Sequence, residues 1–363
     1  MITSYFITAI SFLLGAMIAS LIINKLVLRF AKTLGIRNKN DVVVRWSHAS
    51  KPSLGGISLY ITFIIGVIGY AVLFPVENIF EDTSIVGLLT AATLAFVIGL
   101  SDDAYNTKPL LKFLGQVCCG LIFVFTDNSI EFFQVSLLDN MLTVIWVVAV
   151  MNSLNMLDNM DGITGTVSFF ILLTCVAVFQ LFHPGLNPVC VVLISIELGA
   201  LIGFLYYNVH PAKLFMGDTG SQFIALFVSY FGIKALWNLP SELMLPSWTN
   251  IFVVFAAFTP TIADTLSVVI NRVKRGDSPM LGGKDHTTHH LVYSGKSDRK
   301  VGIIFFIISC FSAITAIFVS YFITINKYSF TWLGLFYFAI VFILLHRITL
   351  KYKRTDIKKD ETD

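Results

Sequence analysis

Long apolar runs recur along this chain and constrain its fold more than any other sequence feature. A helix needs about 20 apolar residues to cross the hydrocarbon core of a bilayer, and eleven segments approach or reach that length. They lie at residues 4–24, 55–74, 84–101, 110–126, 141–157, 163–182, 188–207, 220–237, 249–270, 301–324 and 329–349. Because a lipid-exposed backbone must satisfy its hydrogen bonds within each segment, every run predicts a helix. The sequence therefore predicts an all-α, polytopic integral membrane protein with about eleven transmembrane helices.

The overall composition excludes an ordinary soluble domain. Of the 363 residues, 56% are apolar and 13% charged, and the mean hydropathy is +0.80. The net charge of +3 is too small to indicate a nucleic-acid partner, and none is expected. The five cysteines lie in apolar runs without a CxxC motif, which indicates buried thiols rather than disulfides or metal ligands. We expect one transmembrane catalytic domain at residues 1–350 and a charged cytoplasmic tail at residues 351–363.

The distribution of Lys and Arg predicts the orientation in the membrane. With eleven spans, the connections alternate between two sides, and 23 of the 25 Lys and Arg residues fall on one of them. Cytoplasmic loops carry an excess of these residues, so we expect the N-terminus outside and the C-terminus in the cytoplasm. Every polar motif described below lies on that cytoplasmic side. A carrier would need polar groups in mid-membrane, so this one-sided pattern favours an interfacial enzyme.

The densest polar motif lies between two apolar runs. Asn152, Asn155, Asp158 and Asp161 recur at steps of three and are followed by Gly162. Amides and carboxylates in such a place are unfavourable by several kcal/mol unless something binds them. A polar seam between helices would explain the amides but not the two carboxylates. In a straight helix Asn152 and Asp161 would face opposite ways, so we predict that the helix breaks near Asp158 and that Gly162 turns the chain.

A second acidic motif, Asp102-Asp103, ends another apolar run and is followed by Lys108 and Lys112. Two neighbouring carboxylates disfavour each other's ionisation unless a cation intervenes. The pair therefore favours a metal site or a general base, and a solvated helix end is the alternative. Adjacent helical residues point about 100° apart, so the two carboxylates can diverge. Our hypothesis is that they differ in role and that Asp103 is the more metal-like.

The connection from His210 to Ser221 contains the motif GDTGS. Its glycines permit close backbone approach, and Ser221 is suited to begin the next helix. Free N–H groups at such a helix start favour phosphate, while Asp218 can ligate a hard cation. The motif KPSLGG at residues 51–56 is a weaker signal. It predicts either an anion-binding helix entrance or a simple re-entry turn.

A histidine motif, DHTTHH at residues 285–290, lies in the longest basic loop. The spacing of His286, His289 and His290 predicts three imidazoles along one helix stripe. Zinc is a competing interpretation, and a solvated loop is another. The neighbouring cations, which include Arg272, favour a diphosphate instead.

Taken together, these motifs resemble the polyprenyl-phosphate N-acetylhexosamine-1-phosphate transferases. The resemblance covers nearly the whole chain, with KPxxGG at 51–56, DD at 102–103, KxxxQ at 112–116, NxxNxxDxxDG at 152–162, NxxPAxxFMGDxGS at 208–221 and HxxHH at 286–290. One departure is Asn159, which stands where the family usually has Gly. The span number and the histidine motif are more similar to the undecaprenyl-phosphate N-acetylglucosamine-1-phosphate transferase branch than to the ten-span phospho-N-acetylmuramoyl-pentapeptide transferase branch.

The resemblance implies transfer of a sugar 1-phosphate from a UDP-N-acetylhexosamine, first of all UDP-GlcNAc, to undecaprenyl phosphate, with release of UMP. It implies Mg²⁺, or Mn²⁺ in its place, and a site at the cytoplasmic face of a bacterial cytoplasmic membrane. The implied catalytic residues are Asp102, Asp103, Asp158, His289 and His290, and the implied metal ligands are Asp218, Asp158 and Asp103. The implied substrate-binding residues are Lys51, Lys108, Lys112, Asn152, Asn155, Asp161, Asn208, Lys213, Arg272 and His286. The lipid bilayer is a further partner, and a homodimer is left open.

Three alternatives remain beside this interpretation. The peptidoglycan branch would use UDP-MurNAc-pentapeptide in the same reaction. A CDP-alcohol phosphotransferase is disfavoured because Ile163-Thr164 follow Asp161-Gly162, where its signature has Ala-Arg. A secondary transporter is supported only by the number of spans, since no internal repeat is visible.

Overall fold

The computed structural model describes residues 2–31, 52–75, 78–182, 188–239, 245–279 and 282–352, which are helical with no strand among them. The α-helices are α1 (Ile2–Ala31), α2 (Gly55–Leu73), α3 (Thr83–Tyr105), α4 (Pro109–Phe125), α5 (Ser136–Leu157), α6 (Ile163–Phe182), α7 (Pro188–Asn208), α8 (Gly217–Gly232), α10 (Asn250–Ala257), α11 (Thr259–Arg275), α12 (Thr287–Tyr293), α13 (Asp298–Thr324) and α14 (Trp332–Lys351). Short turns of other helix types are η1 (Ile233–Trp237), η2 (Ser247–Thr249) and η3 (Tyr328–Phe330). The all-α prediction is confirmed for this part of the chain.

Each predicted apolar run contains a helix, but fewer helices are long enough to cross a membrane than the eleven predicted. Eight helices in the described residues have the required length and composition, and a ninth span is possible if the bent pair α10–α11 counts as one. The remaining two runs form α4, with 17 residues, and α8, whose 16 residues continue as the π-helical η1. The eleven spans were predicted from apolar composition alone. Crossing the bilayer also requires a helix that is long enough without a break, and the helices of the remaining two runs are too short.

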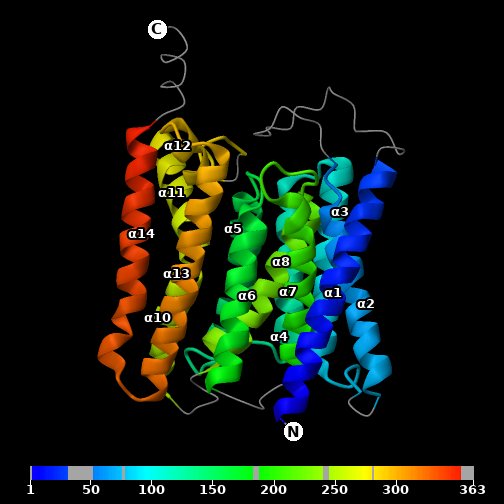
Figure 1. The fold of residues 1–363 in the computed structure, drawn as a ribbon. Coiled ribbons are helices and arrows are strands. Elements are labelled where there is room, and N and C mark those ends of the chain that lie inside the picture. Colours follow the sequence, from blue (N-terminus) through cyan, green and yellow to red (C-terminus); the bar gives the residue numbers. More distant parts are fainter. Residues whose placement is uncertain are drawn as a thin grey trace.

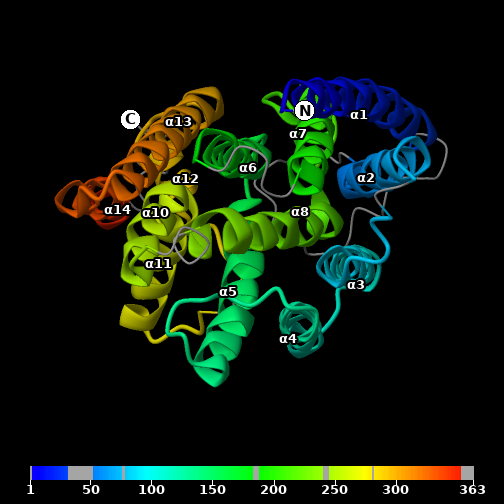
Figure 2. The ribbon, with the colours of Figure 1, turned by 90° about the horizontal axis from the view of Figure 1, so that it is seen from below.

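Helix α8 lies at the centre of the molecule. Every residue of α8 from Thr219 to Gly232 is buried, and Figure 2 shows this helix crossing the middle of the bundle among α3, α5, α6 and α7. On one side α1 packs against α7, and on the other α10, α11, α13 and α14 form a second group (Figures 1 and 2). Because protein covers α8 on every side, this helix forms the core of the bundle rather than a surface toward lipid.

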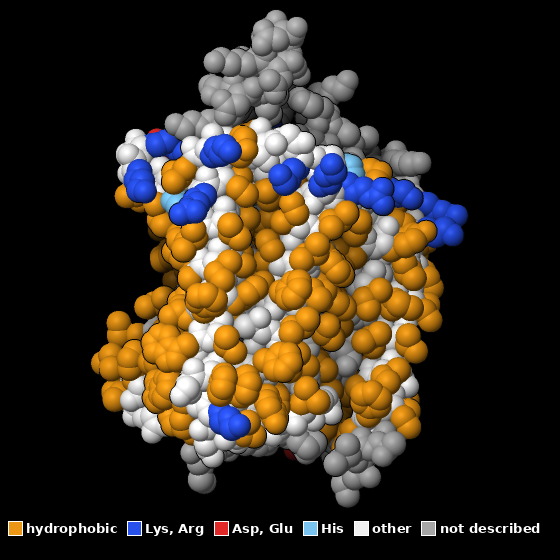
Figure 3. All heavy atoms as spheres, turned by 60° about the vertical axis from the view of Figure 1, so that its left-hand side comes forward, with side chains coloured by type: hydrophobic (Ala, Val, Ile, Leu, Met, Phe, Trp, Pro, Cys, Tyr) orange, Lys and Arg blue, Asp and Glu red, His pale blue; other side chains and the backbone are white. Residues whose placement is uncertain are grey.

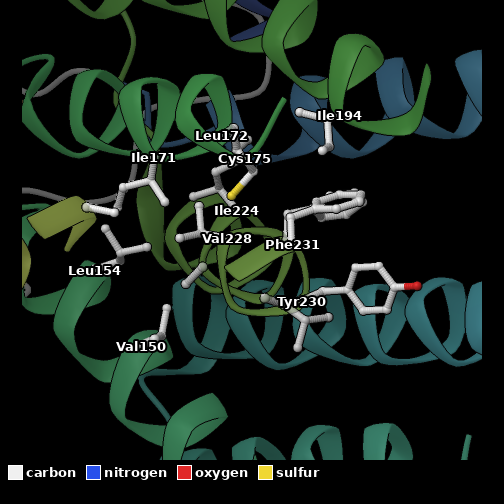
Figure 4. Close-up of a cluster of buried hydrophobic side chains, with 14 of the residues drawn as sticks. Val150, Leu154, Ile171, Leu172, Cys175, Ile194, Ile224, Val228, Tyr230 and Phe231 are labelled. Atoms are coloured by element: carbon white, nitrogen blue, oxygen red, sulfur yellow. The ribbon is translucent and has the colours of Figure 1, made fainter. Parts of the chain in front are cut away.

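The core around α8 is built from side chains of four helices. In Figure 4, Val150 and Leu154 of α5, Ile171 and Cys175 of α6, and Ile194 of α7 lie around the side chains of α8. In a bilayer, lipid tails are as apolar as these side chains, so close packing rather than escape from water holds such helices together. The packed core therefore fixes where the ends of α3, α5 and α8 meet.

The break between α10 and α11 directs polar groups to one end of the second helix group. The two helices meet at an angle of 80°, and Phe258 lies between them. Pro260 in the first turn of α11 has no N–H to donate and disfavours a continuous helix. The helix α11 then runs toward the end of the molecule at which α14 also ends, opposite the start of α1 (Figure 1). Figure 3 shows a band of Lys and Arg side chains near this end of a largely apolar face.

Candidate active site

Glycines allow three helix ends to meet at the site. A Cβ atom at Gly56 would lie 2.2 Å from the backbone nitrogen of Gly220, and one at Gly99 would lie 2.3 Å from the backbone oxygen of Asp218. Gly217 has a φ of +74°, which side-chain-bearing residues rarely adopt. The starts of α2 and α8 and the end of α3 therefore touch through their backbones, which brings the acidic motifs together.

The start of α8 is capped by a carboxylate of this chain. Asp103 accepts hydrogen bonds from the backbone N–H groups of Asp218 (3.2 Å) and Thr219 (2.9 Å) and from Oγ1 of Thr219 (2.7 Å). A carboxylate at a helix N-terminus satisfies free N–H groups and complements the helix dipole. The helix begins at Gly217 rather than at Ser221, so the sequence-based start was wrong by one turn. The N–H groups that we expected to bind phosphate already have a partner.

The KPSLGG motif also uses its donors within the protein. The N–H groups of Gly55 and Gly56 donate to the carbonyl groups of Phe215 and Met216, each at 3.0 Å. This arrangement supports the re-entry turn and leaves these two donors unavailable to an anion. Lys51, a predicted substrate-binding residue, lies outside the described residues.

Lys112 joins three elements of the site. Its Nζ atom donates to Oδ2 of Asp102 (3.0 Å) and Oδ1 of Asn155 (3.1 Å), and it lies 3.4 Å from Oδ2 of Asp218. Asn155 in turn donates to Oδ1 of Asp218 and to the hydroxyl of Ser221. We call Asp102, Lys112, Asn155 and Asp218 the carboxylate–lysine cluster. All four were predicted from the sequence, and they come from α3, α4, α5 and α8.

A layer of amides supports this cluster from the core side. Asn152 donates to Oε1 of Gln116 (2.7 Å), and Gln116 donates to Oε1 of Gln222 (3.0 Å). Gln116 and Gln222 are fully buried. Asn152 therefore contributes to the framework below the cluster rather than to its open face.

The carboxylate–lysine cluster has more negative than positive charge. Nζ of Lys112 lies 3.0 Å from Oδ2 of Asp102 and 3.4 Å from Oδ2 of Asp218, so one lysine bridges the two carboxylates. Two carboxylates this close repel each other unless a proton or a cation is shared. The Asp218 side chain is 36% exposed, so it can be reached from solution. Carboxylate oxygens of this kind suit a hard cation such as Mg²⁺.

The described side chains do not form a complete metal site by themselves. In the described residues no group of three or more His, Cys, Asp or Glu side chains has the spacing of a metal centre. Asp102 and Asp218 could supply two oxygens, and substrate or water the rest, as is usual for Mg²⁺. Both carboxylates accept hydrogen bonds within the protein: Asp103 from the start of α8, and Asp102 from Thr107 and Lys112. Asp102 differs in sharing Lys112 with Asp218, and this shared position favours Asp102 over Asp103 as a ligand, the reverse of our sequence-based hypothesis.

The predicted break after α5 is confirmed. The helix ends at Leu157, Asp158 caps it, and Gly162 has a φ of +75° before α6 begins. The partly buried Asp158 lies one turn beyond Asn155 along the chain, at the same end of the bundle. The turn therefore places Asp158 near the site, while its proposed metal role stays a prediction.

Asp161 and Asn208 connect this turn to the α7–α8 loop. Asp161 accepts hydrogen bonds from the backbone N–H of Ala212 (2.9 Å) and pairs with Nδ1 of His210 (3.1 Å). Asn208 accepts from the N–H of Gly162 (3.1 Å) and donates to the carbonyl of Leu214 (2.9 Å). Both residues were predicted to bind substrate. In this structure their polar atoms hold two loops of the site together.

The histidine motif is organised by a carboxylate that sequence reasoning missed. Asp264 is completely buried, and it accepts from the N–H (2.8 Å) and Oγ1 (2.6 Å) of Thr287 and pairs with Nδ1 of His286 (2.9 Å). The available signal was its position inside an apolar run, where a carboxylate is unfavourable without a partner. Asp264 thereby fixes the start of α12 against α11.

Two arginines complete this second region. Asp285 accepts hydrogen bonds from Arg272 at both oxygens (2.9 and 2.7 Å) and from Arg275 (2.8 Å). Burial raises the pKa of the Asp285 carboxyl, but the hydrogen bonds from Arg272 and Arg275 outweigh burial and hold the pKa below its usual range. We call Asp264, Arg272, Arg275, Asp285 and His286 the histidine–arginine cluster. Arg272 is therefore held by protein groups, rather than lying free for a diphosphate.

The three imidazoles do not form one stripe, so that prediction was wrong. His286 precedes α12 and faces Asp264, whereas His290 contacts the backbone carbonyl of Tyr352. The rings of His286 and His289 lie 5.5 Å apart. Burial lowers the pKa of His289 to about 3, with His286 nearby as a second cause, and burial also lowers the pKa of His290. Both rings are therefore neutral near pH 7, and the divergent partners do not suit zinc.

A hydrogen bond links the histidine helix to the turn after α5. The hydroxyl of Thr288 donates to Oδ1 of Asn159 at 2.6 Å, and Asn159 also donates to the carbonyl of Met156. Asn159, the one departure from the family pattern, thus joins the two halves of the site. The predicted substrate-binding residues Lys108 and Lys213 are exposed in the loops before α4 and before α8.

Comparison with known proteins gives a family and several relatives. Glycosyl transferase family 4 matches residues 85–236, which contain the whole carboxylate–lysine cluster. A probable undecaprenyl-phosphate N-acetylglucosaminyl 1-phosphate transferase of Bacillus subtilis is 29% identical over 81% of this chain and 77% of its own length. A decaprenyl-phosphate N-acetylglucosaminephosphotransferase of Mycolicibacterium smegmatis is 28% identical over 74% of this chain and 72% of its own. A phospho-N-acetylmuramoyl-pentapeptide-transferase of Staphylococcus carnosus is 29% identical over 75% of this chain and 87% of its own.

The matched region covers the helices that carry the acidic motifs, and the relatives extend the similarity to about three quarters of the chain or more. The family model and these relatives together support the polyprenyl-phosphate N-acetylhexosamine-1-phosphate transferase family as the one that this chain resembles.

Proposed function

We propose that this protein transfers N-acetylglucosamine 1-phosphate from UDP-GlcNAc to undecaprenyl phosphate and releases UMP. The observation that carries this proposal is the carboxylate–lysine cluster, in which Lys112 bridges Asp102 and Asp218 at the ends of membrane helices. An amphiphilic acceptor requires a site at the membrane surface, because its phosphate lies in the headgroup region while its tail stays in lipid. The names of the N-acetylglucosamine relatives support the donor and the acceptor.

In the proposed reaction, an oxygen of the acceptor phosphate attacks the sugar-linked phosphorus of the UDP-sugar. A new P–O bond forms, the bond to the UMP oxygen breaks, and UMP leaves with the electron pair. Both reactants are anions, so the main task of the protein is to hold them together against their repulsion. Lys112 is suited to neutralise phosphate charge, because its ammonium group is held in the cluster by Asp102 of α3 and Asn155 of α5.

Magnesium is the cofactor that we propose, with Asp102 and Asp218 as its protein ligands and Asp158 as a nearby carboxylate. When bound, Mg²⁺ supplies charge neutralisation and polarises a phosphoryl oxygen. Asn155 orients Asp218 through the hydrogen bond to Oδ1. Asp103 keeps the start of α8 in place, so that Asp218 faces the open side of the cluster.

A second donor, UDP-MurNAc-pentapeptide, is the alternative within the same reaction. The Staphylococcus carnosus relative, whose name states this type of transfer, favours it about as strongly by identity as the N-acetylglucosamine relatives favour theirs. The histidine helix α12 lies beside the turn after α5, so it is the element expected to contact the diphosphate and the sugar.

For the membrane topology, we propose that the start of α1 is external and that the carboxylate–lysine cluster is cytoplasmic. The Lys and Arg distribution supports this orientation. The corresponding compartment is a bacterial cytoplasmic membrane. Labelling of single cysteines introduced at residues 276–278 from inside but not outside sealed vesicles is the expected result, and the opposite labelling pattern would refute the orientation.

The decisive experiment places the purified protein in lipid vesicles that contain undecaprenyl phosphate and adds Mg²⁺ and one radiolabelled UDP-sugar at a time. We expect label from UDP-GlcNAc to enter the organic phase and UMP to appear in equal amount. Organic-phase label from UDP-MurNAc-pentapeptide alone would select the peptidoglycan donor. Uptake of label into vesicles without a lipid product would refute the transferase and support a transporter.

A further inference from the structure

A lipid-facing groove lies behind the histidine helix and has no role in the proposed transfer. It encloses about 580 Å³ between α12, α13 and α14. Its apolar lining consists of Leu291, Ile304, Ile308, Val341, Leu344, Leu345 and Ile348. This volume falls in the range of about 300–1,000 Å³ that is typical of small-molecule sites.

The groove is basic at one end. Lys296, Arg347 and Lys351 line it together with the apolar residues, and they come from the segment before α13 and from the end of α14. The deeper residues Ile308 and Val341 lie about two turns or more into the same helices. The three cations therefore lie at the polar end of a slot that continues into the membrane region. No carboxylate is found among its described lining residues.

This combination fits one class of occupant. Basic pockets between membrane helices on the cytoplasmic side bind anionic lipid headgroups, and acyl chains fill apolar slots between helices. The band of Lys and Arg over the apolar face in Figure 3 is consistent with a surface that meets anionic lipid. The chain's own residues 353–363, KRTDIKKDETD, contain a single aliphatic residue and do not suit an apolar slot.

The same groove is connected to the site through α12. Leu291 of α12 and Ser294, which follows this helix, line the groove, and Tyr352, which also lines it, accepts the contact from His290 through its backbone carbonyl. One turn before Leu291, Thr288 donates to Asn159 in the turn after α5. An occupant of the groove would therefore contact the same short helix that carries this bond.

We propose that this groove binds one anionic glycerophospholipid of the surrounding membrane, with its phosphate on Lys296, Arg347 and Lys351 and an acyl chain in the apolar slot. The bound lipid supports the position of α12 from behind. The acceptor lipid is a less suitable occupant, because no residue of the carboxylate–lysine cluster lines the groove.

The test compares lipid retention by two triple variants and needs no transfer activity. In the groove variant, Lys296, Arg347 and Lys351 are each changed to Gln. In the matched control, Lys274, Arg299 and Lys300, which are exposed and do not line the groove, are each changed to Gln. Each protein is titrated with phosphatidylglycerol or phosphatidylcholine in detergent and examined by native mass spectrometry.

We expect the wild type and the control to retain one phosphatidylglycerol, and the groove variant to bind it at least about tenfold more weakly. Phosphatidylcholine should be retained weakly by all three. A Leu344→Trp variant keeps the cations but fills the slot, and it should also lose retention. Phosphatidylglycerol should raise the unfolding temperature of the wild type but not of the groove variant.

Three results would overturn the proposal. Equal phosphatidylglycerol binding by the groove variant and the control would show that the three cations are not its site. Displacement of phosphatidylglycerol by undecaprenyl phosphate at lower concentration would assign the groove to the acceptor. Stronger lipid binding after truncation at Tyr352 would show that the chain's own tail occupies the groove. None of these results depends on whether the protein transfers a sugar phosphate.

Discussion

The carboxylate–lysine cluster and the histidine–arginine cluster contain similar residue types but differ in the balance between acidic and basic side chains. In the first, Asp102 and Asp218 face each other with one lysine between them, and Asp218 is partly exposed. In the second, each carboxylate is matched by a His or Arg, and Asp264 is completely buried. A region with surplus negative charge is suited to bind a cation, whereas a fully matched buried network is suited to hold a fixed shape.

This contrast suggests a division of labour in the proposed reaction. The carboxylate–lysine cluster would bind the reacting groups, and the histidine–arginine cluster would hold α12 in position beside them. The bond from Thr288 to Asn159 is the described contact through which the position of α12 reaches the turn after α5. If the contrast is correct, substitutions in the two regions will affect different measurements.

The largest effect is expected for Asp218→Asn. The substitution preserves the size of the side chain but removes a charge that faces the open side of the cluster. We expect transfer to fall by about 10²–10³-fold, the range for loss of one electrostatic group, while the unfolding temperature stays near that of the wild type. Wild-type turnover of Asp218→Asn at limiting Mg²⁺ would remove the cation-binding role from this cluster.

A large loss of stability, rather than of cation binding, is expected for Asp264→Ala. The variant leaves three donors on His286 and Thr287 without their acceptor, and breaking a buried pair typically lowers the free energy of unfolding by about 3–5 kcal/mol. Denaturation in detergent measures this change. The matched control is Asp277→Ala, whose exposed pair with Arg275 should contribute less than about 1 kcal/mol. Equal losses in both variants would contradict the structural role of Asp264.

The two adjacent carboxylates of α3 should separate in a magnesium titration. We expect Asp102→Asn to raise the Mg²⁺ concentration for half-maximal rate about tenfold, the effect of some 1.4 kcal/mol in binding. Asp103→Asn should leave that concentration unchanged but lower the free energy of unfolding by about 0.5–2 kcal/mol, as expected for loss of a helix cap. Indistinguishable Mg²⁺ titrations of the two variants would defeat this division of roles.

A further effect is a pH dependence of stability that originates in α12. Burial lowers the pKa of His289 to about 3, whereas a histidine in an unfolded chain has a pKa of about 6.5. Between these values the unfolded chain binds a proton that the folded protein does not, so stability should fall as the pH is lowered from about 6 to 4. The contribution of one group is at most about 1.4 kcal/mol per pH unit.

Unfolding temperatures of the wild type and His289→Gln between pH 4 and 7 measure this contribution. The variant should show a shallower loss of stability on acidification, because the titrating ring is gone. Identical slopes would mean that His289 does not contribute to the acid sensitivity of α12.

The sequence by itself determined the class of the protein, the places of its helices and the end of the bundle at which the polar motifs gather. Apolar runs identify helices because each backbone must be satisfied locally in lipid. The break at Asp158 was predictable for a local reason as well, since the three-residue spacing does not fit one helix face. Most residues of the carboxylate–lysine cluster were predictable because polar groups at apolar helix ends are unfavourable without a function.

Tertiary structure alone decided which polar groups pair and what they hold. Asp102 and Asp103 are neighbours in sequence, yet one meets Lys112 of α4 and the other meets Thr219, which is 116 residues away. Asp264 gives no local sign of its partner His286, because α11 and α12 are brought together by a fold that sequence spacing does not specify. Local periodicity fixes the face of a helix on which a side chain lies. The partner on the neighbouring helix is fixed only when the helices pack, and in this protein glycine contacts between α2, α3 and α8 set that packing.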